Sequence, residues 1–318
     1  MFSRLVSIFA PLRTKIILRQ MVKLADLIQK NIEALCDCEG SEYRHINRED
    51  GQSLPNMTKL KEIISIVKEI VFPGFFSEAG SNVSTQKYHL GIQMERLNSL
   101  LTEQIKNGLL FFSNQDSDAS NGRDAKTLAL SFLEKIPEIK RLLITDVQAM
   151  YDNDPAAESP GEVIICYPSI QAMIHYRVAH ELLLLGIPVL PRIITELAHS
   201  ATGIDIHPGA QIGEYFSIDH GTGVVIGETA IIGKHVNLYK GVTLGAKNFV
   251  LDECGNPINI PRHPIVEDNV VIYSNATVLG RITIGHDSVI GGNVWLTSGV
   301  PPHSRIVQQK AFSNEKEG

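Results

Sequence analysis

Apolar residues in the first 200 positions of the chain recur every three or four residues, the spacing of one face of an α-helix. The pattern is clear from Leu60 to Val71 and again from Tyr88 to Leu110. A polar stretch from Ser113 to Arg123 predicts a loop, and Pro137 predicts a kink or break within the following helix. The helices predicted in this way cover about residues 60–71, 88–110, 124–150, 169–185 and 191–199.

After Gly203 the period changes to six. One aliphatic or small residue recurs at every sixth position in two runs, and glycine often follows it. This period fits a triangular coil in which each hexad makes one short flat side and one turn. We therefore expect a parallel β-helix of hexapeptide repeats, in which each inward residue stacks on its equivalent three hexads later. The two runs are Ile206, Ile212, Ile218, Val224, Ala230, Val236 and Val242, and then Val266, Ile272, Val278, Ile284, Ile290 and Leu296.

The gap between the two runs has the composition of a loop. Residues 247–262 carry two prolines, two adjacent acidic residues and a glycine. A loop extruded from a solenoid is a natural place for binding residues, and a tolerated insertion is the plain alternative. We expect an α+β fold in four parts. These are a poorly defined helical extension (1–55), an α-helical domain (56–203), the β-helix (204–300) with its extruded loop (247–262), and a C-terminal tail (301–318).

The composition mainly excludes certain classes of protein and certain kinds of site. The net charge of −6 argues against a protein whose main task is to bind nucleic acid. No apolar run reaches the ~18 residues that a membrane-spanning helix needs. The four cysteines are sparse and irregularly spaced, which favours neither a disulfide framework nor a zinc site.

The first 25 residues carry five basic residues and no acid. An organelle transit peptide has this composition, but an amphipathic helix fits better because the apolar pattern continues to Leu35. We therefore expect a cytoplasmic protein, with organelle targeting through the basic N-terminus as the alternative.

Residues that could do chemistry gather on the first turns of the coil. Asp205, His207, Asp219, His220 and Glu228 fall within 24 residues. Asp205 and His220 are 15 residues apart, a little less than one turn, so they can lie close together. A carboxylate that holds a histidine in one tautomer makes a general base with a pKa near the working pH. The plain alternative for a single histidine is a surface or corner residue.

A second cluster closes the extruded loop. Arg262, followed by His263, could take a substrate carboxylate in a bidentate pair. The glycines from Gly221 to Gly227 resemble a phosphate-binding loop, but their spacing is wrong and no helix follows them. Three polar residues of one predicted helix fit packing or capping better than ligation: His175, Arg177 and His180.

These stretches resemble the signature of the bacterial serine acetyltransferases, in particular the long-form branch with an extended helical domain. The resemblance covers roughly residues 60–308. It implies a left-handed β-helix and transfer of an acetyl group from acetyl-coenzyme A to the hydroxyl of L-serine, the first step of cysteine biosynthesis from serine. It rests on Asp205-Ile-His-Pro-Gly-Ala, Asp219-His220-Gly through Gly227-Glu-Thr-Ala, Val242-Thr-Leu-Gly, Arg262-His263-Pro264, the run from Leu142 to Ala157, Tyr176-Arg-Val-Ala-His, Phe72-Pro-Gly-Phe-Phe and Tyr88-His-Leu-Gly.

The resemblance also implies roles for the residues that match the family's motifs. His220 is the implied general base and Asp205 its orienting partner. Asp154 and Asp219 are implied to bind the serine ammonium group and to hold the hydroxyl in place. Acetyl-coenzyme A is the implied co-substrate, and no metal is implied. Arg262 and His263 are implied to bind the serine carboxylate, and the coenzyme A arm is implied to pass Ser274, Ala276, Gly291 and Gly292.

The resemblance further implies a homotrimer with its site between subunits, a dimer of trimers as a further step, and L-cysteine as a feedback inhibitor. The family's common form ends in a longer tail, whose terminal isoleucine enters the active site of the next enzyme, O-acetylserine sulfhydrylase. This sequence ends at Gly318, so we do not expect that complex. Neither a nucleic acid nor a membrane is expected as a partner.

Three other interpretations stay open on the sequence alone. A hexapeptide acetyltransferase acting on a sugar or amino sugar would explain the coil and His220, but not Asp154 or the helical half. A zinc carbonic anhydrase on the same kind of coil would need three histidines that converge between subunits. A non-catalytic solenoid is disfavoured by the dense polar residues on adjacent turns. The histidines available to a zinc site are His207, His220, His235, His263 and His286, and none of their spacings is convincing.

Overall fold

The computed structural model describes residues 20–35, 54–76, 83–113 and 124–308. The chain forms two compact units, Met1–Gln52 and Ser53–Gly318. In the first unit, residues 20–35 form an exposed helix. Most of the basic N-terminal segment, most of the polar loop predicted at 113–123, and the tail beyond residue 308 lie outside the described residues, as do Cys36 and Cys38.

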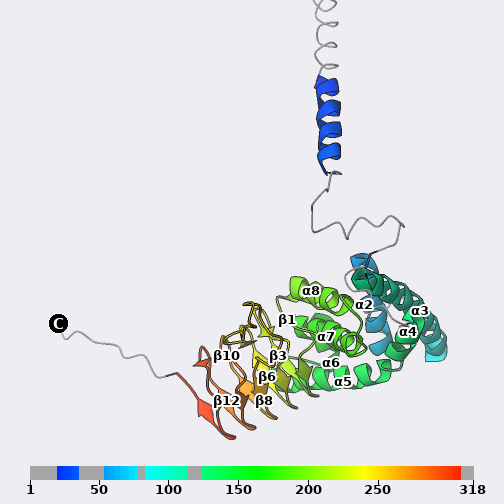
Figure 1. Ribbon diagram of the computed structural model, residues 1–318. Coiled ribbons are helices and arrows are strands. Elements are labelled where there is room, and N and C mark those ends of the chain that lie inside the picture. Colours follow the sequence, from blue (N-terminus) through cyan, green and yellow to red (C-terminus); the bar gives the residue numbers. More distant parts are fainter. Residues whose placement is uncertain (1–19, 36–53, 77–82, 114–123, 309–318) are drawn as a thin grey trace, which may run out of the picture. The chain divides into compact units, whose positions relative to one another are not determined.

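The second unit begins with helices (Figure 1): α2 (Met57–Val71), α3 (Val83–Ser113), α4 (Ala125–Leu133), α5 (Ile136–Asn153), α6 (Pro160–Cys166), α7 (Pro168–Leu184) and α8 (Leu190–Thr202). The helices predicted near 60–71, 88–110, 169–185 and 191–199 are confirmed. The helix predicted over 124–150 is also confirmed, together with its break near Pro137: α4 ends at Leu133, and Pro137 lies in the first turn of α5. No described helix is long and apolar enough to cross a membrane.

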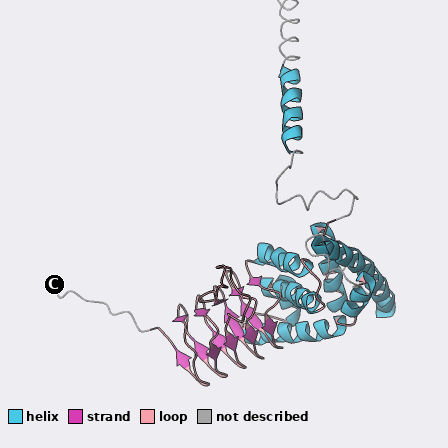
Figure 2. Cartoon of the chain, in the orientation of Figure 1, coloured by secondary structure: helices cyan, strands magenta, loops and turns pink. Residues whose placement is uncertain are grey.

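Short strands follow and stack in successive rungs beside the helices, as Figure 2 shows. They pair in parallel and form three sheets, which make the three sides of a coil: sheet A (β1-β4-β7-β10-β13), sheet B (β2-β5-β8-β11) and sheet C (β3-β6-β9-β12-β14). The predicted fold, helices followed by a left-handed parallel β-helix, is confirmed. The strands are β1 (Asp205–Ile206), β2 (Gln211–Ile212), β3 (Ser217–Asp219), β4 (Val225–Ile226), β5 (Ile231–Ile232), β6 (Asn237–Tyr239), β7 (Thr243–Gly245), β8 (Ile265–Val266), β9 (Val271–Ile272), β10 (Thr277–Leu279), β11 (Thr283–Ile284), β12 (Val289–Ile290), β13 (Trp295–Leu296) and β14 (Arg305–Ile306).

The strand register departs from a strict period of six at one point in the first turn. Ile226 pairs with Leu244, so a regular turn takes 18 residues. Ile206 pairs with Ile226 rather than with Val224, so the first turn takes 20. The inward series predicted after Ile218 is therefore wrong in phase, although both series are buried. The residues that stack are Ile226, Ile232, Leu238 and Leu244 instead of Val224, Ala230, Val236 and Val242.

A second departure is the excursion between β7 and β8. The step from Leu244 to Val278 takes 34 residues, 16 more than a regular turn. The additional residues belong to the segment that contains the predicted loop 247–262. At its tip the Asp252 carboxylate accepts hydrogen bonds from two backbone N–H groups. Beyond the excursion the strands pair as before.

The corner between sheets B and C carries a residue in the left-handed backbone region on successive turns. Tyr215, His235, Asn269, Asp287 and His303 have φ between 55° and 60°. From His235 onward, each backbone N–H donates to a carbonyl of the previous turn, which aligns the five residues in one column. Tyr215 stacks on His235 with ring centroids 4.6 Å apart.

The helices and the coil share one continuous core. At their junction Arg177 of α7 and Asp146 of α5 form an ion pair in which the side chains are only 4% and 0% exposed. The same guanidinium donates hydrogen bonds of 2.6 Å to the backbone carbonyls of Ile212 and Gly213 in the coil. The packing role predicted for Arg177 is confirmed, and this contact fastens α5 to the first turn.

Candidate active site

The two additional residues of the first turn lie at the corner that carries His220. The backbones of His220 (φ 57°) and Gly221 (φ 91°) are both in the left-handed region. A Cβ at Gly221 would overlap the Ile204 side chain, so both φ and space require glycine there. The His220 imidazole is 71% exposed, and its Nε2 lies 3.8 Å from Oδ1 of Asp219. The insertion thus holds His220 out from the coil, where a substrate can reach it.

Asp154 and Asp219 line one small cavity that is open to solvent, and the volume of about 210 Å³ around them includes that open space. Asp154 caps the C-terminus of α5, and Asp219 ends β3. The Tyr167 hydroxyl, at the start of α7, donates a 2.5 Å hydrogen bond to Oδ2 of Asp154. This bond is the main cause of the lowered pKa of the Asp154 carboxyl, with a further contribution from the backbone N–H of Ala156. A cavity with two carboxylates suits an ammonium group.

Two features of this cavity were missed by the sequence reasoning. Tyr167 carries no motif, and its place just before Pro168 at a helix start gives no sign that it meets Asp154. Asn153 donates a 3.2 Å hydrogen bond to the Ser217 hydroxyl, which ties the end of α5 to β3. Both contacts depend on how the helices are fastened to the coil.

The predicted partner of His220 faces other groups. Asp205 begins β1, and one of its carboxylate oxygens lies within 4.8 Å of a carboxylate oxygen of Glu196 and a ring nitrogen of His199, both in α8. Among the described residues no hydrogen bond joins Asp205 and His220, and the carboxylate paired with His220 is Asp219. The Asp205–His220 pair therefore stays a prediction.

Arg262 and His263 lie where the extruded loop rejoins the coil. Arg262 Nη2 is 2.5 Å from Oε2 of Glu228, so its charge is already paired. Nδ1 of His263 accepts a 3.0 Å hydrogen bond from the backbone N–H of Thr229, and burial is the main cause of the lowered pKa of this histidine. The neutral ring therefore carries its proton on Nε2. That edge of the ring lies against Gly227, where a Cβ would overlap it.

Sheet A separates the two groups of candidate residues. His220 and Asp219 lie at the corner between sheets C and A, because β3 ends there and β4 begins. Arg262 and His263 lie at the corner between sheets A and B, after β7 and before β8. One chain therefore presents two half-sites on opposite edges of the same sheet and does not bring them together.

Three of the four positions implied to line the coenzyme A arm are partly exposed. Ser274, Gly291 and Gly292 lie on neighbouring turns, and a Cβ at Gly292 would come within 3.2 Å of the Ser274 carbonyl oxygen. Ala276, the fourth position, is fully buried, and its backbone N–H and C=O are both hydrogen-bonded within the coil. Its contact with coenzyme A stays a prediction.

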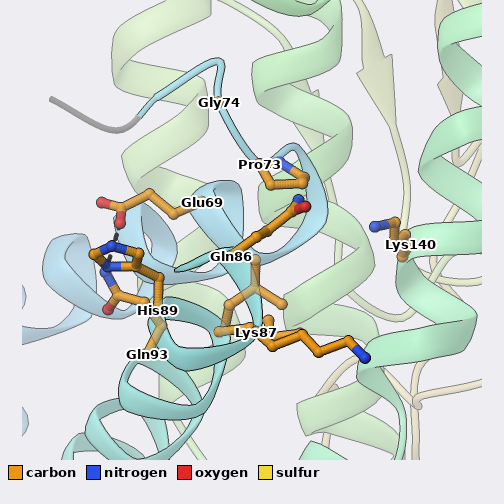
Figure 3. Close-up of a pocket in the computed structure, with 10 residues that line it drawn as sticks. Glu69, Pro73, Gly74, Gln86, Lys87, His89, Gln93 and Lys140 are labelled. Atoms are coloured by element: carbon orange, nitrogen blue, oxygen red, sulfur yellow. Dashed lines mark hydrogen bonds between the residues drawn. The ribbon is translucent and has the colours of Figure 1, made fainter. Parts of the chain in front are cut away.

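A larger hollow of about 960 Å³, open to solvent, lies among α2, α3 and α5. Figure 3 shows Glu69, His89 and Gln93 together on one side of it and Lys140 across from them. Gln93 donates a 2.5 Å hydrogen bond to Glu69. None of the predicted site residues lines this hollow. We therefore place the candidate active site on the coil, where the predicted residues and a cavity coincide.

The described residues contain two groups that could hold a metal ion, and neither joins three histidines. One is Glu196, His199 and Asp205, and the other is His286, Asp287 and His303.

Comparison with known proteins identifies the family. Residues 263–298 match the profile of the bacterial transferase hexapeptide family (six repeats). The plasmid serine acetyltransferase of Synechococcus elongatus is 46% identical over 86% of this chain and 88% of its own length. The crystal structure of Entamoeba histolytica serine acetyltransferase 1 in complex with L-cysteine is 38% identical, with a TM-score of 0.66 over 77% of this chain and 86% of that one. Neisseria gonorrhoeae serine acetyltransferase in complex with serine is 26% identical, with a TM-score of 0.51 over 79% of this chain and 97% of that one. From the length and identity of the first match, this chain belongs to the serine acetyltransferase family.

Proposed function

We propose that the protein transfers the acetyl group of acetyl-coenzyme A to the hydroxyl of L-serine, giving O-acetyl-L-serine and coenzyme A, the first step of cysteine biosynthesis from serine. The names of its relatives and their complexes with serine and L-cysteine support this. The main structural support is the exposed side chain of His220, held out from the coil by the two additional residues of the first turn. The neighbouring Asp219 lines a cavity together with Asp154.

The cavity is the proposed seat of the serine ammonium group. The hydrogen bond from Tyr167 lowers the pKa of the Asp154 carboxyl, so this carboxylate stays ionised to lower pH than an ordinary aspartate and can pair with the serine ammonium group at neutral pH. Arg262 and His263 are the proposed partners of the serine carboxylate. The Nε2–H of His263 is the available donor on that ring, and Arg262 would share its guanidinium between Glu228 and the substrate.

His220 is the proposed general base. Its neutral imidazole takes the hydroxyl proton while the serine oxygen attacks the thioester carbonyl carbon. The tetrahedral intermediate then collapses as the carbon–sulfur bond breaks, and the imidazolium returns the proton to the departing thiolate. Asp205 is proposed to orient the imidazole, which requires a rearrangement of side chains on assembly or substrate binding. The coenzyme A arm is proposed to pass Ser274, Gly291 and Gly292.

The two half-sites support a homotrimer. Val225 and Trp295 of sheet A are 37% and 70% exposed, which leaves apolar surface between the half-sites. Three chains packed side by side would set the His220 corner of one against the Arg262 corner of the next. A dimer of trimers, and inhibition by L-cysteine in the serine site, belong to the same proposal by analogy with the family.

The activity is tested by measuring thiol release from acetyl-coenzyme A with a panel of acceptors that includes L-serine and amino sugars, with and without L-cysteine. We expect release with L-serine only. His220→Ala should lose at least ~10²-fold in turnover, the lower end of what a general base contributes. Acetylation of an amino sugar in place of serine, or wild-type turnover in His220→Ala, would overturn the proposal.

Sharing of the site is tested by coexpressing His220→Ala with Arg262→Ala. Each variant alone should be nearly inactive. Each mixed trimer would have one interface of its three that joins an intact His220 to an intact Arg262. With equal expression and random assembly about three quarters of the trimers are mixed, so about a quarter of the wild-type activity should return. If verified mixed trimers stay inactive, both halves of the site come from one chain.

A further inference from the structure

We propose that His286, Asp287 and His303 form a binding site for one late first-row divalent metal ion, Zn²⁺ in the first instance, apart from the acyl-transfer site. One ligand atom of each residue lies within 4.8 Å of the other two. His286 Nδ1 is 2.6 Å and His303 Nδ1 is 3.8 Å from the same oxygen, Oδ2 of Asp287. Two imidazole nitrogens and one carboxylate oxygen therefore converge on one point.

These ligands are positioned by the column of left-handed residues at the corner between sheets B and C. Asp287 and His303 occupy its last two places, and the His303 backbone N–H donates a 2.9 Å hydrogen bond to the carbonyl of His286. Asn269, one turn earlier, donates a 3.0 Å hydrogen bond to Oδ1 of Asp287, which leaves Oδ2 facing the imidazoles. The Glu267 carboxylate accepts a 2.8 Å hydrogen bond from the backbone N–H of His286. Outer contacts of this kind orient metal ligands and sharpen affinity.

The donor set selects the class of metal. Two imidazoles with one carboxylate suit Zn²⁺, Ni²⁺ or Cu²⁺, whereas Mg²⁺ and Ca²⁺ prefer oxygen ligands throughout. Bonds of about 2.0–2.1 Å in a tetrahedral site put ligand atoms about 3.3–3.4 Å apart. The pair formed by His303 and Asp287 is close to this separation. The hydrogen-bonded pair formed by His286 and Asp287 must open by less than 1 Å, which side-chain rotation provides at these partly exposed positions.

The ion would join two turns of the coil. His286 and Asp287 lie between β11 and β12, and His303 lies just before β14, the last described rung. In sheet C, β14 pairs with β12 on one side, and no strand of the described residues pairs with its other edge; an edge rung of this kind gains from a cap. A metal held by His303 and the preceding turn would fasten that end, and bound metal stabilises the folded state by mass action.

The test is isothermal titration of the metal-free full-length chain, without a histidine tag, with ZnCl₂. We expect one ion per chain, bound at least about tenfold more weakly in His303→Asn and Asp287→Asn. Asparagine is chosen for His303 because it tolerates the left-handed region. The matched control is His235→Asn, at the same corner with similar φ but stacked on Tyr215, and it should bind as the wild type does.

Two further readouts locate the ion. Co²⁺ should give visible absorption bands in the wild type that disappear in His303→Asn. Zn²⁺ should raise the melting temperature of the wild type but not of Asp287→Asn, with equal melting temperatures in EDTA showing that both chains fold. Absence of saturable binding, binding that both variants leave intact, or loss of the ion only in His199→Asn would overturn the proposal. The last result would assign the ion to Glu196, His199 and Asp205.

Discussion

Replacing Arg177 by methionine should destabilise the protein by about 3–5 kcal/mol, the usual cost of removing one partner of a buried ion pair. The change leaves the Asp146 carboxylate without its cation in a site where it is fully buried. It also removes the donors for the carbonyls of Ile212 and Gly213. For a chain of this size each kcal/mol moves the melting temperature by about 2–4 °C, so we expect a fall of about 6–20 °C.

The measurement is thermal and urea unfolding followed by circular dichroism at one fixed protein concentration. Two variants separate charge from packing. Arg177→Lys keeps the charge but loses the two-pronged geometry, so it should fall between the wild type and Arg177→Met. The double variant Asp146→Leu, Arg177→Met buries no charge, so it should be more stable than Arg177→Met alone. A loss below about 1 kcal/mol in Arg177→Met, or a double variant no better than that single one, would refute the reasoning.

The same substitution should reach the serine site through α5. Arg177 fastens α5 to the first turn, and α5 ends next to Asp154, which shares its cavity with Asp219. We therefore expect the KM for serine to rise in Arg177→Met while the KM for acetyl-coenzyme A changes less. An unchanged KM for serine would show that the position of Asp154 does not depend on this ion pair.

Three further outcomes are expected. Gly227→Ala should raise the KM for serine, because its Cβ would displace the His263 ring, and steady-state kinetics in which neither KM changes would contradict that. Tyr167→Phe should raise the KM for serine about tenfold, because Asp154 loses the hydrogen bond that orients it. The acid limit of serine binding should also move to higher pH, because the pKa of Asp154 rises toward its ordinary value of about 4; KM measured from about pH 3 to 7 in both proteins decides, and an unmoved acid limit would contradict this. Burial lowers the pKa of His175 to about 4, so the unfolded chain binds a proton between pH 6.5 and 4 that the folded chain does not, and stability should fall by up to about 3 kcal/mol as the pH drops through that window. The free energy of unfolding measured with urea should depend less on pH in His175→Gln than in the wild type. An equal pH dependence in the two proteins would count against this explanation.

The β-helix could be predicted from the sequence because aliphatic residues repeat in it at a fixed spacing. Which of the two buried positions in each hexad stacks on the next turn could not be predicted. Each hexad buries two aliphatic positions two residues apart, as at Val224 and Ile226. A two-residue insertion moves the stacking residue from one position to the other without interrupting the periodic pattern. The sign of the insertion was the glycine-rich run after His220, where positive φ values concentrate.

Candidate residues could be named from the sequence, but their partners could not. Arg262 pairs with Glu228, 34 residues away, only because the loop rejoins the coil one turn above that glutamate. The ring of His263 is set by Thr229 for the same reason. The burial of Ala276 could not be predicted either, because small residues line both the open edges and the core of a tight coil.

The excursion at residues 247–262 leaves the pairing above and below it intact, since β5 pairs with β8 across it as β2 pairs with β5 before it. Its length and composition are therefore free to change without disturbing the scaffold. Arg262 and His263, proposed to bind the acceptor carboxylate, lie where this loop rejoins the coil. The proposed base, His220, lies at a different corner. Exchanging this one insert is thus a route to altered acceptor choice in which the proton-transfer machinery is left untouched.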